Sequence, residues 1–144
     1  MRDNRNLYFG MNTLGNAIVP GSLTTLTATA VGGAETRPII IITRSGGVSA
    51  HIINVYNRST GAEIILNTPI LDGETIVIDL VNLRITSTYF GHVRVITPQA
   101  GSRMASFALL PTGNQIDVRV DNDGATITSV LRYRQQYHSF AAAD

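Results

Sequence analysis

The amino-acid sequence predicts an all-β fold, a single antiparallel β-sandwich of about ten short strands with little or no helix. Ile, Val and Thr are abundant, and their branched side chains suit a pleated, half-buried surface. Turn residues recur about every eight to twelve positions, which is the spacing of a sandwich or barrel. No stretch of convincing length has the 3.6-residue period of a helix.

The chain of 144 residues is long enough for one domain, and its 44% hydrophobic content is enough to form a core. Residues 1–21 are polar, rich in Gly and Asn, and end at Pro20-Gly21. We therefore expect an N-terminal arm or linker over 1–21 and the β-sandwich domain over 22–144.

The first expected strands differ in how they are buried. Residues 22–31 alternate Thr with small or apolar residues, as a half-buried strand does, and Gly32-Gly33 ends them. These two glycines could equally form a hinge that makes the Thr-rich strand a separate arm. The four isoleucines within residues 38–43 predict a buried strand.

The next two strands are predicted to form a hairpin. Residues 48–56 alternate, and we expect Ala50, Ile52 and Asn54 on one face with His51, Ile53 and Val55 on the other. The loop is Asn57-Arg58-Ser59-Thr60-Gly61, and residues 63–67 return from it.

The second half of the chain continues in the same way. A tight turn at 71–74 leads into a strand over 75–80, in which Ile76, Ile78 and Leu80 share a face. The remaining strands are expected over residues 83–88, 93–97, 105–110, 115–120 and 125–137. Asp121-Asn122-Asp123-Gly124 is interpreted as a hairpin turn, because the further oxygen ligands and distal Glu of a calcium loop do not follow it.

Composition argues against several classes of function. A net charge of +1 gives no electrostatic reason to bind nucleic acid, and no stretch approaches the ~18 apolar residues of a membrane span. The absence of cysteine excludes disulfides, Cys-ligated zinc and Cys nucleophiles. No cofactor and no metal ligand is predicted.

Candidate catalytic residues are isolated from one another. Ser102 is not in a nucleophile elbow, and His51, His92 and His138 have no evident partners. Asp79 and Asp117 are the strand carboxylates that a glycosidase would need to place across a cleft. No catalytic residue is predicted, and an enzyme is the disfavoured hypothesis.

Aromatic residues give the best contact candidates. Tyr89 and Phe90 fall on a turn, while Tyr133 and Tyr137 share one face of the last strand beside Arg134. Exposed aromatic and Arg side chains are common anchors of interfaces, and aromatic rings can also stack on sugars. The alternative is that these rings pack on the sheet or against a neighbouring subunit.

An ordered set of segments over roughly residues 22–140 resembles the C-terminal, galectin-like sandwich of siphophage distal tail proteins. The segments are the Thr-rich strand with Gly32-Gly33 and Pro38-Ile39-Ile40-Ile41; Asn57-Arg58-Ser59-Thr60-Gly61-Ala62-Glu63-Ile64; residues 71–79; Gly101-Ser102 before Phe107-Ala108-Leu109; Leu110-Pro111-Thr112-Gly113-Asn114-Gln115-Ile116; and Tyr133-Arg134-Gln135-Gln136-Tyr137. The resemblance implies a galectin-like or jelly-roll sandwich and a structural role at the tail tip.

In that family an N-terminal belt domain forms a hexameric ring around the tail axis, and the sandwich projects outward. This chain is too short to hold the belt domain. A fragment of a longer protein, a separate minor tail protein and a sandwich reused elsewhere all remain open. The family has no catalytic residues to carry over.

We therefore predict a non-enzymatic component of a phage or prophage tail, located in the virion and in contact with other tail or tail-tip proteins. Both an oligomer in the assembled tail and a monomer in isolation are left open. The alternative is a carbohydrate-binding module for a host-surface glycan, because some members of the family carry sugar-binding insertions.

Overall fold

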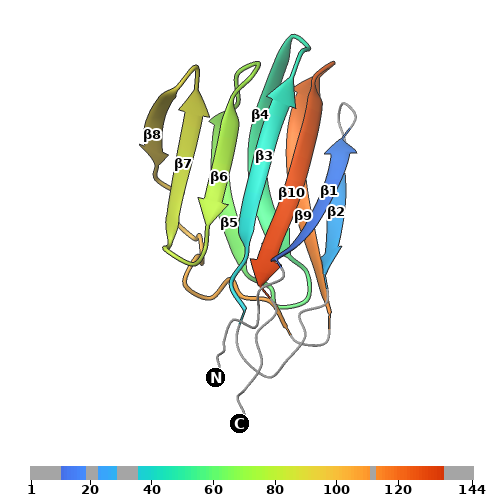
Figure 1. The fold of residues 1–144 in the computed structure, drawn as a ribbon, viewed down its shortest axis with the longest axis vertical. Coiled ribbons are helices and arrows are strands. Elements are labelled where there is room, and N and C mark those ends of the chain that lie inside the picture. Colours follow the sequence, from blue (N-terminus) through green and yellow to red (C-terminus); the bar gives the residue numbers. More distant parts are fainter. Residues whose placement is uncertain (1–10, 19–22, 29–35, 111–112, 135–144) are drawn as a thin grey trace.

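The structure is a computed structural model that describes residues 11–18, 23–28, 36–110 and 113–134. These residues form ten β-strands and no helix. The strands make two antiparallel sheets that face each other, as Figure 1 shows. The predicted antiparallel β-sandwich is therefore confirmed.

One sheet has six strands and the other has four. In the six-stranded sheet the order is β1 (Met11–Ile18), β10 (Thr126–Arg134), β3 (Ile39–Ser45), β6 (Thr75–Asp79), β7 (Arg84–Tyr89) and β8 (His92–Ile96). In the four-stranded sheet it is β2 (Leu23–Ala28), β9 (Asn114–Asp123), β4 (Ser49–Asn57) and β5 (Glu63–Pro69).

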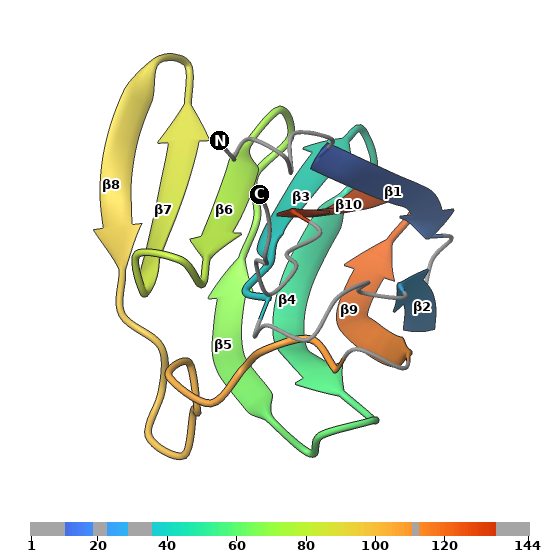
Figure 2. The same ribbon diagram turned by 60° about the horizontal axis from the view of Figure 1, so that its bottom comes forward.

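The connectivity is that of an eight-stranded jelly roll with a hairpin added at one edge. The chain changes sheet at every connection except β4–β5, β6–β7 and β7–β8, so the order 1-10-3-6 faces the order 2-9-4-5. Strands β7 and β8 stand outside this scheme and continue the larger sheet past β6. In Figure 2 this yellow hairpin lies beyond β5, the last strand of the other sheet.

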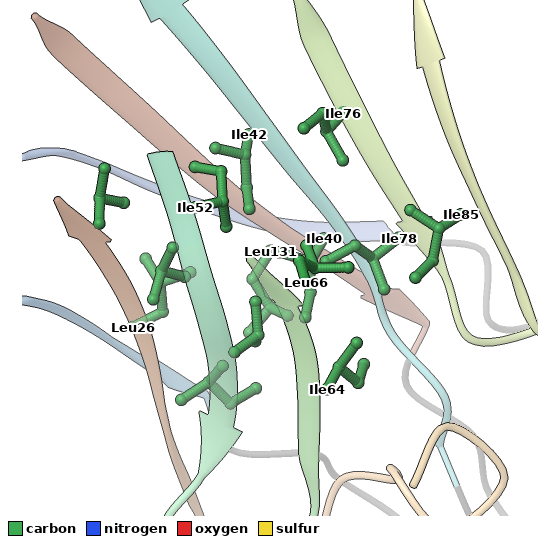
Figure 3. Packing of buried hydrophobic residues seen from close by; sticks show 14 of the residues in the cluster. Leu26, Ile40, Ile42, Ile52, Ile64, Leu66, Ile76, Ile78, Ile85 and Leu131 are labelled. Carbon is green, nitrogen blue, oxygen red and sulfur yellow. The ribbon is translucent and has the colours of Figure 1, made fainter. Parts of the chain in front are cut away.

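The core lies between the two sheets, and isoleucine is its commonest residue. Alternate residues of each strand point inward, so Ile40 and Ile42 of β3 are fully buried, as are Ile76 and Ile78 of β6. Ile52 and Ile64 face them from the opposite sheet, as Figure 3 shows. Each fully buried side chain of this size contributes about 1.5–3 kcal/mol relative to an exposed one.

Two expected segments differ in the structure. Residues 11–18, expected in an arm or linker, form β1, which pairs with β10 from Met11–Arg134 to Ile18–Ile127. Backbone pairing with β10 gives this segment its strand conformation although its apolar residues do not alternate. The expected strand over 105–110 is instead a loop with one isolated bridge, from Leu109 to Thr36.

That loop nevertheless fills the core. Phe107 is fully buried and Leu109 is 3% exposed, whereas the residues between and beside them are more exposed. Burial therefore alternates along this segment as it would in a strand. This alternation does not produce a strand here because no neighbouring strand pairs along the segment's length.

Two local expectations are also corrected. Asp121-Asn122-Asp123-Gly124 does not close a hairpin within one sheet, because β9 and β10 belong to different sheets.

A β-bulge in β4, between Ile52 and Asn54, turns Asn54 away from the core and Val55 into it. The expected faces therefore hold for Ala50, Ile52, His51 and Ile53 and are wrong for Asn54 and Val55.

Candidate functional site

The tip of the β7–β8 hairpin is a two-residue turn made by Phe90 and Gly91. Both residues have positive φ, 48° for Phe90 and 79° for Gly91, and Tyr89 pairs with His92 across the turn. Asn-Gly is the usual sequence for such a turn, because Asn tolerates the left-handed region and a bulky ring does not. Phe90 is also 82% exposed, so its ring adds nothing to the core.

Apolar exposure continues from the turn along β8. Val93 and Val95 are each 66% exposed and point outward from the same face of the strand, whereas Ile96 is buried. The rings of Tyr89 and Phe90 lie 4.5 Å apart between their centroids. We define Phe90, Val93 and Val95 as the hairpin patch.

The edge of β8 is open, unlike the edge of β5. In the described part of the chain β8 pairs with β7 alone. The β5 edge is covered by the loop after β8, in which Gln99 N–H donates to Ile65 O (2.9 Å) and Arg103 N–H to Glu63 O (2.7 Å). Ser102 Oγ accepts from Ile65 N–H (2.8 Å). An open edge strand presents unpaired backbone groups to a partner.

A buried carboxylate fixes the inner side of the hairpin. Glu74 is 1% exposed, and its Oε2 accepts hydrogen bonds from Ser87 Oγ and from Arg94 Nη2 (3.4 Å). Its Oε1 accepts from Leu71 N–H (2.7 Å). The network ties β7 and β8 to the turn before β6, so the hairpin is anchored to the jelly roll by buried polar contacts.

The structure brings together only part of the predicted contact set. Tyr89 and Phe90 are neighbours on the hairpin, but Tyr133 is 6% exposed and belongs to the core. Tyr133 is therefore not an exposed anchor, because inward alternation along β10 places its ring between the sheets. Arg134 is the last residue of β10 and pairs with Met11, while Tyr137 lies outside the described residues.

Register also separates the two groups of aromatic residues. Thr88, next to Tyr89, is level with Thr75, Thr43 and Thr128 across four strands. Tyr133 lies five residues beyond this row, at the opposite end of β10. Tyr89 and Phe90 therefore lie far from Tyr133, at the other end of the strands of this sheet.

The two strand carboxylates considered for glycosidase chemistry lie on opposite outer faces of the sandwich. Asp79 follows buried Ile78 in one sheet, and Asp117 lies between buried Ile116 and Val118 in the other. Asp79 accepts from Val81 N–H (2.9 Å) and Asn82 N–H (3.0 Å), which caps the β6–β7 turn. Two carboxylates separated by the core cannot flank one glycosidic bond.

The other chemical candidates have simple positions. His51 is half-buried on the outer face of β4, His92 is exposed at the start of β8, and His138 lies outside the described residues. Within the described ranges no cluster of three or more His, Cys, Asp or Glu could hold a metal ion. The same ranges contain no helix long and apolar enough to cross a membrane.

A further polar group was missed by sequence reasoning. Tyr56 of β4 is 37% exposed and lies directly between Asp117 of β9 and Glu63 of β5. Arg58 Nε donates to Asp117 Oδ2 (2.6 Å), and the hydrogen bond and charge of that carboxylate raise the pKa of Arg58. The sequence signal for this group was the polar residues within 54–58. Simple alternation assigns Asn54 and Tyr56 to the inner face, and the β-bulge shifts that alternation by one residue.

Comparison with known proteins identifies no relative. No protein-family model matches the chain, and neither a curated protein nor a solved structure matches it.

Proposed function

We propose that this domain is a non-enzymatic structural component that works through protein–protein contacts made by the β7–β8 hairpin. Phe90 is the observation that carries the proposal. A bulky ring in a left-handed turn position costs on the order of 1 kcal/mol, and this ring is 82% exposed. The folded domain gains little from the residue, which favours a role for its ring outside the domain.

The topology supports the same assignment. The eight-stranded jelly roll is complete without β7 and β8, so the hairpin is an addition at one side of the sandwich. Its outer face carries the hairpin patch, and its edge is open to another strand. Exposed apolar side chains beside an open edge suit strand addition by a partner protein.

For the biological setting we propose the tail tip of a phage or prophage, with other tail proteins as partners. The ordered segments that resemble distal tail proteins support this setting, and a sandwich is the fold that the resemblance implies. We likewise propose that this chain is related to the galectin-like sandwiches of that family.

The test is co-expression of the full chain with the proteins encoded by the flanking reading frames, followed by co-purification. We expect a complex with a tail or tail-tip protein. Val95→Asp should abolish it by placing a charge in the patch, and Val48→Asp is the matched control because Val48 is 79% exposed on a different loop.

Phe90→Asn separates binding from folding. We expect it to weaken the complex while raising the free energy of unfolding by about 0.5–1 kcal/mol, since Asn is favoured in this turn. Flanking genes for polysaccharide metabolism would overturn the tail setting. A complex that survives both Val95→Asp and Phe90→Asn would overturn the hairpin as the contact surface.

A further inference from the structure

The outer face of the four-stranded sheet carries a second set of functional groups, on the other side of the sandwich from the hairpin patch. Register places Asp117, Tyr56 and Glu63 in one row across β9, β4 and β5. Arg119 and Asn54 form the next row, and Arg58 follows the end of β4. We call Asn54, Tyr56, Arg58, Glu63, Asp117 and Arg119 the Tyr56 face.

Several of these side chains are held in fixed positions. Asn54 Nδ2 donates to Glu63 Oε2 (2.6 Å), and Arg58 Nε donates to Asp117 Oδ2 (2.6 Å). The side chain of Asp117 is only 11% exposed although it lies on the outer face, whereas that of Arg58 is 45% exposed. Planar polar groups held in this way lose little entropy when they bind a ligand.

Two groups on the same face have hydrogen-bonding capacity to spare. Neither the Tyr56 hydroxyl nor the exposed Arg119 guanidinium hydrogen-bonds to any residue within the described ranges. The guanidinium is a fork of donors, and the phenol can donate and accept. The β-bulge between Ile52 and Asn54 is what turns Asn54 and Tyr56 outward together.

The charges restrict the class of ligand. Within the Tyr56 face two guanidiniums, Arg58 and Arg119, accompany two carboxylates, Asp117 and Glu63. The exposed Asp121 adds a further negative charge beside Arg119 on the same side of β9, so both signs of charge lie close together. A polyanion would approach the carboxylates and a polycation the guanidiniums, whereas a neutral polyhydroxylated ligand can donate to one pair and accept from the other. The exposed ring of Tyr56 gives such a ligand an apolar surface in the middle of these groups.

We infer that the Tyr56 face binds a neutral oligosaccharide, with Tyr56 stacking on a sugar ring and with Arg119 and Glu63 bonding its hydroxyls. This activity is independent of the proposed protein contacts, because it uses the other sheet. It also places glycan recognition away from Tyr89 and Tyr133, the residues that the sequence suggested for it.

The experiment applies the full chain to an array of neutral oligosaccharides, with sulfated and sialylated forms of the same sugars as the comparison. We expect binding to neutral glycans and no gain from added negative charge. Calorimetry with the best neutral glycan then gives the Kd of each variant.

Tyr56→Ala should weaken that Kd about tenfold or more, because the central aromatic contact is lost. Arg119→Gln should weaken it about fivefold or more without affecting folding, since this side chain is exposed. Arg132→Gln is the matched control, an exposed Arg on the outer face of the six-stranded sheet, and it should leave the Kd unchanged. Thermal unfolding of each variant establishes that it is folded.

Three results would overturn the inference: no binding to any neutral glycan, stronger binding to the sulfated forms, or a Kd unaffected by both Tyr56→Ala and Arg119→Gln. Val95→Asp should retain glycan binding even where it abolishes the protein complex. Failure of the glycan site and failure of the hairpin contact are thereby distinguished.

Discussion

Gly47 packs directly against the backbone of Ala125. A Cβ built on Gly47 would lie 2.3 Å from Ala125 N and 2.4 Å from its Cα. The contact joins the turn between β3 and β4 to the crossing between β9 and β10, and Val48 N–H donates to Asp123 O (2.8 Å) beside it. Two connections that each pass between the sheets therefore meet at one corner of the sandwich.

Gly47→Ala should destabilise the domain by more than about 2 kcal/mol, measured by urea unfolding. The methyl group would collide with backbone atoms that cannot rotate away, in addition to the cost of a side chain at a φ of 76°. Gly46→Ala is the control, because Gly46 has a φ of 74° but nothing within 4 Å of its Cβ position. Equal losses for the two variants would contradict the packing argument and leave only backbone strain.

Ser129→Ala should stabilise the domain by up to about 1 kcal/mol. Ser129 is fully buried in β10, and its hydroxyl has no hydrogen-bond partner in the described part of the chain. Removing a buried, unpaired hydroxyl avoids its desolvation cost and leaves a side chain of nearly the same size. A lower melting temperature for Ser129→Ala would show that the hydroxyl is satisfied and that this prediction is wrong.

Asp79 should make the stability of the β6–β7 turn depend on acid. Partial burial raises the pKa of Asp79, but hydrogen bonds from Asn82 and Val81 and the charge of Arg84 together hold it below its usual value. Its stabilising contribution is therefore complete above the unfolded pKa of about 3.9 and is lost as the pH falls through the lower folded pKa.

Unfolding of the native chain and of Asp79→Asn, measured at about pH 7 and about pH 3, tests this dependence. We expect the native chain to be more stable by about 0.5–1.5 kcal/mol at the higher pH and the difference to shrink in acid. A difference that is the same at both pH values would mean that the charge of Asp79 contributes nothing.

Most of the fold could be predicted because burial repeats every second residue in most strands. The four isoleucines of 39–42 and the row Ile76, Ile78 and Leu80 identify their strands unambiguously. The strand β1 could not be predicted in this way, since pairing with β10 rather than an apolar face defines it. The loop containing Phe107 shows the reverse case, in which alternation reports burial without strand pairing.

The candidate sites were harder to predict because exposure depends on which sheet covers a strand. Tyr89 and Phe90 were found from a turn signal, and local sequence defines that turn. The burial of Tyr133 depends on the opposite sheet, and the outward direction of Tyr56 depends on a one-residue bulge. Neither feature is encoded in the residues next to it along the chain.

The position of the hairpin outside the eight-stranded jelly roll has an evolutionary consequence. Substitutions at Val93, Val95 and Phe90 change an outward surface and leave the buried isoleucines untouched. Recognition can therefore diversify under selection while the hydrophobic core stays the same. Lineages that share this scaffold should vary most rapidly at these three positions and be most uniform at the corner where Gly47 meets Ala125.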